Sequence, residues 1–108
     1  MADVPQLQLF EIVELTPGSL SGTVRCVAGT VRLGDRVELL PAAGRPVAEG
    51  LTISAIEYAG GIPMEFVDLG RTALVTVTGL IDEAALRAMV AGNAPDQVVP
   101  ADLRLIVP

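Results

Sequence analysis

Residues 18–39 read GSLSGTVRCVAGTVRLGDRVEL, a series of short runs rich in valine, leucine and threonine that glycines separate. Runs of this length and composition are typical of β-strands, which favour β-branched side chains. Gly29 and Gly34 can adopt the positive φ that a sharp chain reversal requires, and Asp35 can accept hydrogen bonds within its own turn. Three strands joined by tight turns are therefore predicted, over residues 20–28, 30–33 and 36–40.

The same alternation of apolar runs and turn residues continues on both sides of this segment. Thr16-Pro17-Gly18-Ser19 ends the preceding run, and the order Pro then Gly predicts a type II turn. Residues 60–63, Gly-Gly-Ile-Pro, end the next predicted strand. Residues 64–69 favour no single secondary structure. Further strands are predicted over residues 7–15, 47–58, 71–78 and 102–107, the last returning to close a barrel.

The apolar side chains change face within residues 47–58. Leu51 and Ile53 share one face of the predicted strand, whereas Ile56 and Tyr58 fall on the opposite face. A strand that changes face without ending usually contains a β-bulge or a bend at a barrel corner. One of these irregularities is therefore predicted near the middle of this strand.

One short helix is predicted over residues 82–91, because Asp82 can cap its N-terminus and Gly92-Asn93 suits its end. The rest of the chain carries only strand and turn signals. Its length suits one domain with one hydrophobic core. The sequence therefore predicts a single all-β domain over residues 1–108, a small closed or nearly closed β-barrel of about six strands with one short helix.

Three stretches together resemble the β-barrel that forms the second domain of translational GTPases, after the GTPase domain of elongation and initiation factors. They are residues 18–39, the glycine-led strand LGRTALVTVTG at 69–79, and the short segment 82–90. The resemblance covers about residues 7–92. The chain lacks a G-x-x-x-x-G-K-[ST] loop, which cradles nucleotide phosphates, so we expect no GTPase activity.

The resemblance implies a docking module, since this barrel contacts the partner GTPase domain, the ribosome and, in some factors, the aminoacyl end of tRNA. In the tRNA-carrying factors, an acidic residue on the strand before the glycine-led one lines the pocket for the terminal adenosine. Glu57 is the nearest match by position, and it is the candidate ligand-binding residue. The alternative interpretation of Glu57 is a solvated surface carboxylate.

Composition sets limits on the partner. The chain has 13 acidic and 7 basic residues, a formal net charge of −6, and only three aromatic residues. An acidic surface repels phosphate backbones, and base stacking has few aromatic platforms here. An RNA-binding groove would need Arg25, Arg32 and Arg36 to gather on one face. The charge therefore favours a basic or neutral protein partner over RNA.

No catalytic, cofactor or metal site is predicted. The chain has no His and a single cysteine, Cys26, which shares a strand face with Val24 and is expected to fill the core. Ser19, Ser21 and Ser54 have no histidine to activate them. No apolar run approaches the about 20 residues of a membrane helix, and no signal peptide is evident, so a cytoplasmic location without membrane association is expected.

Three functions remain open from the sequence. The leading hypothesis is a non-catalytic binding module, a stand-alone relative of the translation-factor barrel, that docks on a protein partner. The alternative is an RNA- or ribosome-associated accessory factor. The second alternative is a structural subunit that assembles with copies of itself, because an incompletely closed barrel leaves strand edges that can pair.

Overall fold

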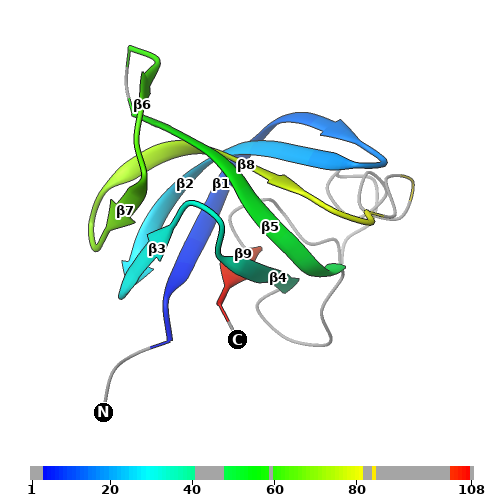
Figure 1. Ribbon diagram of the computed structural model, residues 1–108, viewed down its shortest axis with the longest axis horizontal. Coiled ribbons are helices and arrows are strands. Elements are labelled where there is room, and N and C mark those ends of the chain that lie inside the picture. Colours follow the sequence, from blue (N-terminus) through cyan, green and yellow to red (C-terminus); the bar gives the residue numbers. More distant parts are fainter. Residues whose placement is uncertain (1–3, 41–47, 59, 82–83, 85–102, 108) are drawn as a thin grey trace, which may run out of the picture.

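The computed structural model describes residues 4–40, 48–58, 60–81, 84 and 103–107. Almost every described residue lies in a strand or in the turn between two strands (Figure 1). The strands in chain order are β1 (Gln6–Thr16), β2 (Ser19–Ala28), β3 (Thr30–Arg32), β4 (Arg36–Leu40), β5 (Ala48–Tyr58), β6 (Ile62–Pro63), β7 (Phe66–Asp68), β8 (Thr72–Thr78) and β9 (Arg104–Ile106).

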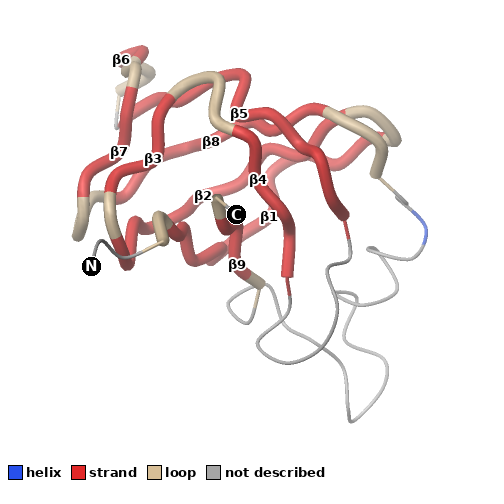
Figure 2. The backbone as a smooth tube through the Cα atoms, turned by 60° about the horizontal axis from the view of Figure 1, so that its bottom comes forward, coloured by secondary structure: helices blue, strands red, loops and turns tan. Residues whose placement is uncertain are grey.

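Six of these strands close into an antiparallel barrel. The hydrogen-bonded order is β4-β9-β1-β2-β8-β5, and β5 pairs back with β4 to complete the ring. Figure 2 shows the strands curving around a common interior. The short β6 extends the sheet beyond β5, while β3 and β7 form a separate two-stranded sheet. The prediction of a small closed barrel of about six strands is confirmed.

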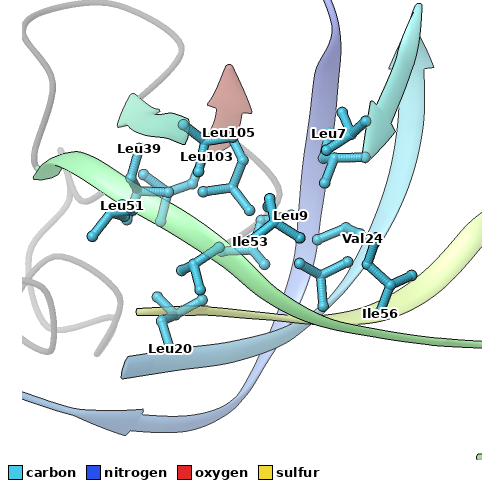
Figure 3. Close-up of a cluster of buried hydrophobic side chains, with 14 of the residues drawn as sticks. Leu7, Leu9, Leu20, Val24, Leu39, Leu51, Ile53, Ile56, Leu103 and Leu105 are labelled. Atoms are coloured by element: carbon cyan, nitrogen blue, oxygen red, sulfur yellow. The ribbon is translucent and has the colours of Figure 1, made fainter. Parts of the chain in front are cut away.

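The last strand closes the ring, as its sequence predicted. Leu105 of β9 lies opposite Leu7 of β1 on one side and opposite Leu39 of β4 on the other. All three side chains are buried, and Figure 3 shows them directed into the same interior. Strand β9, with three residues, therefore bridges β1 and β4 in the ring.

The core is built from aliphatic side chains, since no Trp is available and the aromatic residues stay at its margin. Burying a leucine or isoleucine fully contributes about 1.5–3 kcal/mol, so this set provides the main stabilisation of the barrel. No polar or charged residue is buried among the described residues. The largest fully buried side chains are Leu7, Leu9, Leu20, Leu39, Leu51, Ile53, Ile56, Leu103 and Leu105.

A bulge in β5 accounts for the change of face seen in its sequence. The register of β5 against β8 shifts between Ile53 and Ala55, so Ser54 is an extra residue that stays exposed. The bulge allows Ile53 and Ile56 to point inward on either side of the shift. The predicted irregularity is confirmed.

The turns around β3 also follow the prediction. Gly29 and Gly34 adopt φ values of 63° and 91°, which side chains with a β-carbon rarely adopt. The Arg32 amide donates a hydrogen bond to Asp35 Oδ2 at 2.9 Å, and the Asp35 amide donates to the Arg32 carbonyl at 3.0 Å. Asp35 therefore stabilises its turn through hydrogen bonds of both its side chain and its backbone.

The type II turn predicted at Pro17-Gly18 is wrong. Gly18 is not among the glycines with positive φ, and a type II turn requires positive φ at that position. The Thr16 Oγ1 atom instead accepts hydrogen bonds from the amides of Gly18 at 3.3 Å and Ser19 at 3.0 Å. A side-chain hydroxyl organises this turn, so glycine's conformational freedom is not used.

Residues 60–70 resolve the segment that the sequence left open. Gly60 and Gly61 have positive φ and turn the chain from β5 into β6, with a hydrogen bond from the Gly61 amide to the Tyr58 carbonyl at 3.0 Å. Strand β7 then pairs with β3. The predicted helix over 82–91 lies outside the described residues, apart from Ala84.

Candidate binding site on the barrel wall

The outer wall of β2, β8 and β5 carries three rows of directly opposite residues. Val75 and Val77 of β8 point into the core, so the residues that alternate with them face outward. Glu57 is the one charged residue of these rows. The rows, which we call the hydroxyl wall, are Ser19–Thr78–Thr52, Ser21–Thr76–Ala55 and Thr23–Leu74–Glu57.

Hydrogen bonds fix several hydroxyl groups of this wall. Ser21 Oγ and Thr76 Oγ1 lie 2.8 Å apart across β2 and β8, and Ser54 Oγ donates to the Thr76 carbonyl at 3.1 Å. Ser19 Oγ is 2.9 Å from Thr16 Oγ1. The three serines considered as nucleophiles therefore have structural partners, and the chain has no histidine to act as their base.

A surface pocket of about 290 Å³ lies at one end of the hydroxyl wall. Its floor comes from β8, where Leu74 is half-buried and Ala73 is buried. Its sides come from the neighbouring strands β2 and β5. We call it the Glu57 pocket, and its lining residues are Thr23, Glu57, Tyr58, Thr72, Ala73 and Leu74.

The Glu57 side chain is half-buried between two strands, opposite Leu74 of β8 and Pro63 of β6. Within the described part of the chain it has no hydrogen-bond or ion-pair partner. A carboxylate that is partly removed from water without a partner retains a strong capacity to bind a donor. The structure thus places the predicted ligand residue in a pocket.

A cation lies over the ring of Tyr58, the residue that follows Glu57. The Arg71 guanidinium carbon lies 5.8 Å from the centre of the Tyr58 ring, within the range of a cation–π interaction. Tyr58 Oη in turn donates a hydrogen bond to the Phe66 carbonyl at 3.4 Å, which orients the ring. Arg71 is therefore a neighbour of Tyr58, next to Glu57 in the chain, but it is not among the residues that line the pocket. Sequence reasoning used Tyr58 to locate the change of face in its strand, but it did not assign Tyr58 or Arg71 to a site.

The three arginines considered for an RNA groove do not gather on one face. Arg25 lies opposite Thr72, at the start of β8, whereas Arg36 lies opposite Thr52, which pairs with the end of β8. Arg32 belongs to β3 in the second sheet. The fold therefore separates residues that are close in sequence.

Another pair of arginines does come close through the fold. Arg25 of β2 and Arg104 of β9 both lie opposite Gln8 of β1, on the two sides of that strand. Arg104 Nη1 donates a hydrogen bond to Gln6 Oε1 at 3.2 Å. This arrangement has no signal in the sequence, since it depends on the order of strands in the barrel.

Cys26 is part of the core, as predicted. Its side chain is 1% exposed, and its Sγ lies 3.2 Å from the Gly29 carbonyl and 3.4 Å from the Ala28 carbonyl, to which it donates. Burial raises the pKa of the thiol above its ordinary value, an effect that the nearby Asp68 carboxylate reinforces. A buried, protonated thiol is a poor nucleophile.

The described residues contain no group of three or more His, Cys, Asp or Glu side chains arranged to hold a metal ion. In the same part of the chain, no helix has the length and apolar character needed to cross a bilayer.

Comparisons with known proteins bear on the fold. No protein-family model matches the chain, and no curated protein matches it significantly. Among solved structures, it is similar to GDP-bound aIF5B of Aeropyrum pernix, an archaeal initiation factor and translational GTPase, with a TM-score of 0.62 and 16% sequence identity. The match covers 97% of this chain and 15% of that chain.

This similarity shows that the chain has a β-barrel fold also present in a translational GTPase. At 16% identity it establishes the fold alone, since one fold supports many functions. The chain spans about 15% of the length of that factor. Function therefore has to be argued from the hydroxyl wall and the Glu57 pocket.

Proposed function

We propose that this protein is a non-catalytic, translation-related binding module of the cytoplasm that docks on a protein partner through its hydroxyl wall. The observation that carries the proposal is the charge distribution of that wall. The chain has 20 charged side chains among 108 residues, 13 acidic and 7 basic, yet Glu57 is the one charge in the three rows. A partner that covers these nine residues has only one ionised side chain to remove from water, which keeps the cost of desolvation low.

The wall also offers hydrogen bonds at a low entropic cost. Serine and threonine side chains are short, and the bond between Ser21 and Thr76 already holds two of them. Ordering short side chains on a rigid sheet costs less conformational entropy than ordering long charged ones. A partner can therefore bond to the wall without large rearrangement of this chain.

The two alternatives have weaker support. An RNA-binding role would be favoured by a shared face for Arg25, Arg32 and Arg36, and the fold separates them. Self-assembly through open barrel edges would require an unclosed ring, whereas each of the six barrel strands has a neighbour on both sides. The protein-docking hypothesis is the one that the surface supports best.

Capture of partners from the native lysate by tagged protein tests the proposal, with and without nuclease and at two salt concentrations. Thr76→Arg places a long charged side chain at the centre of the wall, and Thr78→Arg does so at an exposed position of the same strand. We expect both variants to lose a protein that wild type retains after nuclease treatment. That protein, once identified and purified, should bind wild type directly.

Leu33→Arg is the matched control, because Leu33 is 45% exposed and lies outside the wall. Circular dichroism of each variant confirms that the barrel is folded. Retention of the partner by both wall variants would contradict docking at this face. Loss of all captured material on nuclease treatment would instead favour the RNA-associated alternative, and oligomers of the pure protein in sedimentation would favour self-assembly.

A further inference from the structure

We infer that the Glu57 pocket receives one arginine or lysine side chain of the protein partner. The aliphatic stem of that residue would lie along Leu74, and its cationic head would bind the Glu57 carboxylate. The inference rests on the proposed docking function and specifies the chemistry that the docking face recognises.

The lining of the pocket suits such a side chain. Leu74 provides a half-buried apolar side chain, and Thr23 and Thr72 place hydroxyl groups beside it. Arginine and lysine carry an apolar stem that packs on such surface while the charged end reaches a polar group. Threonine hydroxyl oxygens can accept the remaining N–H groups of the head.

The charge of the site points the same way. Glu57 has no partner among the described residues, and it is the one charge of the wall. A bond between a carboxylate and a guanidinium or ammonium is roughly twice as strong as a bond between neutral groups. The net charge of −6 also attracts a basic partner over a longer range. An anionic ligand would meet repulsion from both sources.

Arg71 limits the affinity of the pocket for cations. Its guanidinium is held over Tyr58, and its backbone is fixed by hydrogen bonds from its amide to the Asp68 carbonyl at 3.0 Å and from the Cys26 amide to its carbonyl at 2.9 Å. A cation bound to Glu57 therefore experiences electrostatic repulsion from the Arg71 charge, which is held over the neighbouring residue Tyr58. Removing the Arg71 charge should strengthen binding of a cation and weaken binding of an anion.

The first experiment titrates the ¹⁵N-labelled full chain with N-acetyl-arginine amide and follows the amide shifts of Glu57, Tyr58 and Leu74 by NMR. N-acetyl-leucine amide reports the apolar contribution alone. We expect Glu57→Gln to weaken binding of the arginine probe about ten-fold, since a charge-assisted hydrogen bond is lost. Glu57→Gln should leave the leucine probe unchanged.

Glu65→Gln is the matched control. Glu65 is exposed and lines a separate depression of about 340 Å³ with Arg32, Leu33 and Phe66. The Glu65→Gln substitution removes the same charge as Glu57→Gln. An equal loss of affinity for the arginine probe in both variants would therefore show a general effect of net charge and overturn the inference. Shifts confined to the Glu65 depression would overturn it as well.

The second experiment uses Arg71→Gln and a pair of probes with opposite charge, N-acetyl-arginine amide and adenosine 5′-monophosphate. The inference requires Arg71→Gln to tighten binding of the arginine probe and Glu57→Gln to weaken it. If the pocket serves an RNA end, Arg71→Gln weakens binding of adenosine 5′-monophosphate and Glu57→Gln strengthens it. The arginine probe then does not bind. That outcome overturns the inference.

The captured partner separates this inference from the docking function on which it rests. If Thr78→Arg abolishes binding of the partner and Glu57→Gln leaves it unchanged, docking stands and the inference about the pocket is wrong. If neither variant affects the partner, docking at this face is wrong. Support for the inference requires loss in both, together with loss when the docking arginine or lysine of the partner is replaced by methionine.

Discussion

The α-carbon of Gly22 in β2 lies against the main-chain carbonyl of Glu11 in β1. A β-carbon at position 22 would come within 2.5 Å of the Glu11 oxygen and 2.6 Å of Leu9 Cδ1. The register of β1 against β2 shifts on either side of this contact, between Leu9 and Glu11 and between Ile12 and Glu14. The close approach therefore occurs where irregular pairing bends the two longest neighbouring strands, and only glycine fits there.

We expect Gly22→Ala to destabilise the barrel by about 3 kcal/mol or more, because backbone atoms must move to admit the methyl group. Thermal and urea unfolding measure the loss. Gly18→Ala is the control, since Gly18 does not have positive φ and no atom lies within 4 Å of a β-carbon built there. Equal unfolding midpoints for the two variants would contradict the close contact.

The turn before β4 provides a second prediction. Asp35→Ala removes the acceptor for the Arg32 amide and should cost about 1 kcal/mol, while Asp35→Asn retains an acceptor and should cost less. Hydrogen exchange checks the mechanism, because the Arg32 amide should exchange faster in Asp35→Ala. Unchanged protection of that amide in Asp35→Ala would show that the side-chain bond does not close the turn.

Local sequence patterns predicted local structure well. The bulge between Ile53 and Ala55 was predictable because the apolar residues on either side of it occupy opposite phases of one strand. The turn glycines Gly29 and Gly34 were predictable as well, since each directly follows a run of residues with a strand pattern. The turn at Gly18 was assigned wrongly because the Thr16 hydroxyl, not the Pro-Gly order, determines its conformation.

The site was predictable only in part. Glu57 was selected by its position in a family resemblance, and it does line a pocket. The rest of the pocket comes from β2 and β8, and the register between these strands is not encoded by any local pattern. Ser21 and Thr76, which share a hydrogen bond on the wall, are 55 residues apart in the chain. Such neighbours depend on how the strands pair in the barrel. The sequence predicts the barrel, but it does not predict which residues of two paired strands lie opposite each other.

Barrel closure itself leads to a third prediction. Leu105 is buried between Leu7 and Leu39, whereas its neighbour Ile106 faces outward and is half-buried. Leu105→Ala should therefore reduce the free energy of unfolding by about 3 kcal/mol, and Ile106→Ala by less than about 1 kcal/mol. Urea denaturation of the two variants measures the difference. A larger loss of unfolding free energy for Ile106→Ala than for Leu105→Ala would contradict the register of β9 described above.

Cys26 provides the fourth prediction, which concerns pH. Because burial raises the pKa of the thiol above the ordinary value of 9.0, the folded state disfavours the thiolate relative to the unfolded chain. The contribution of the thiol to stability is therefore complete below pH 9.0 and decreases as the pH rises through the folded pKa. The difference in unfolding free energy between wild type and Cys26→Ala should shrink between pH 8 and pH 10.

The thiol of the native protein should also react slowly with a disulfide reagent at pH 8, and the thiol of the protein unfolded in urea should react rapidly. A constant difference across this range, or fast labelling of the native thiol, would contradict a buried, protonated Cys26.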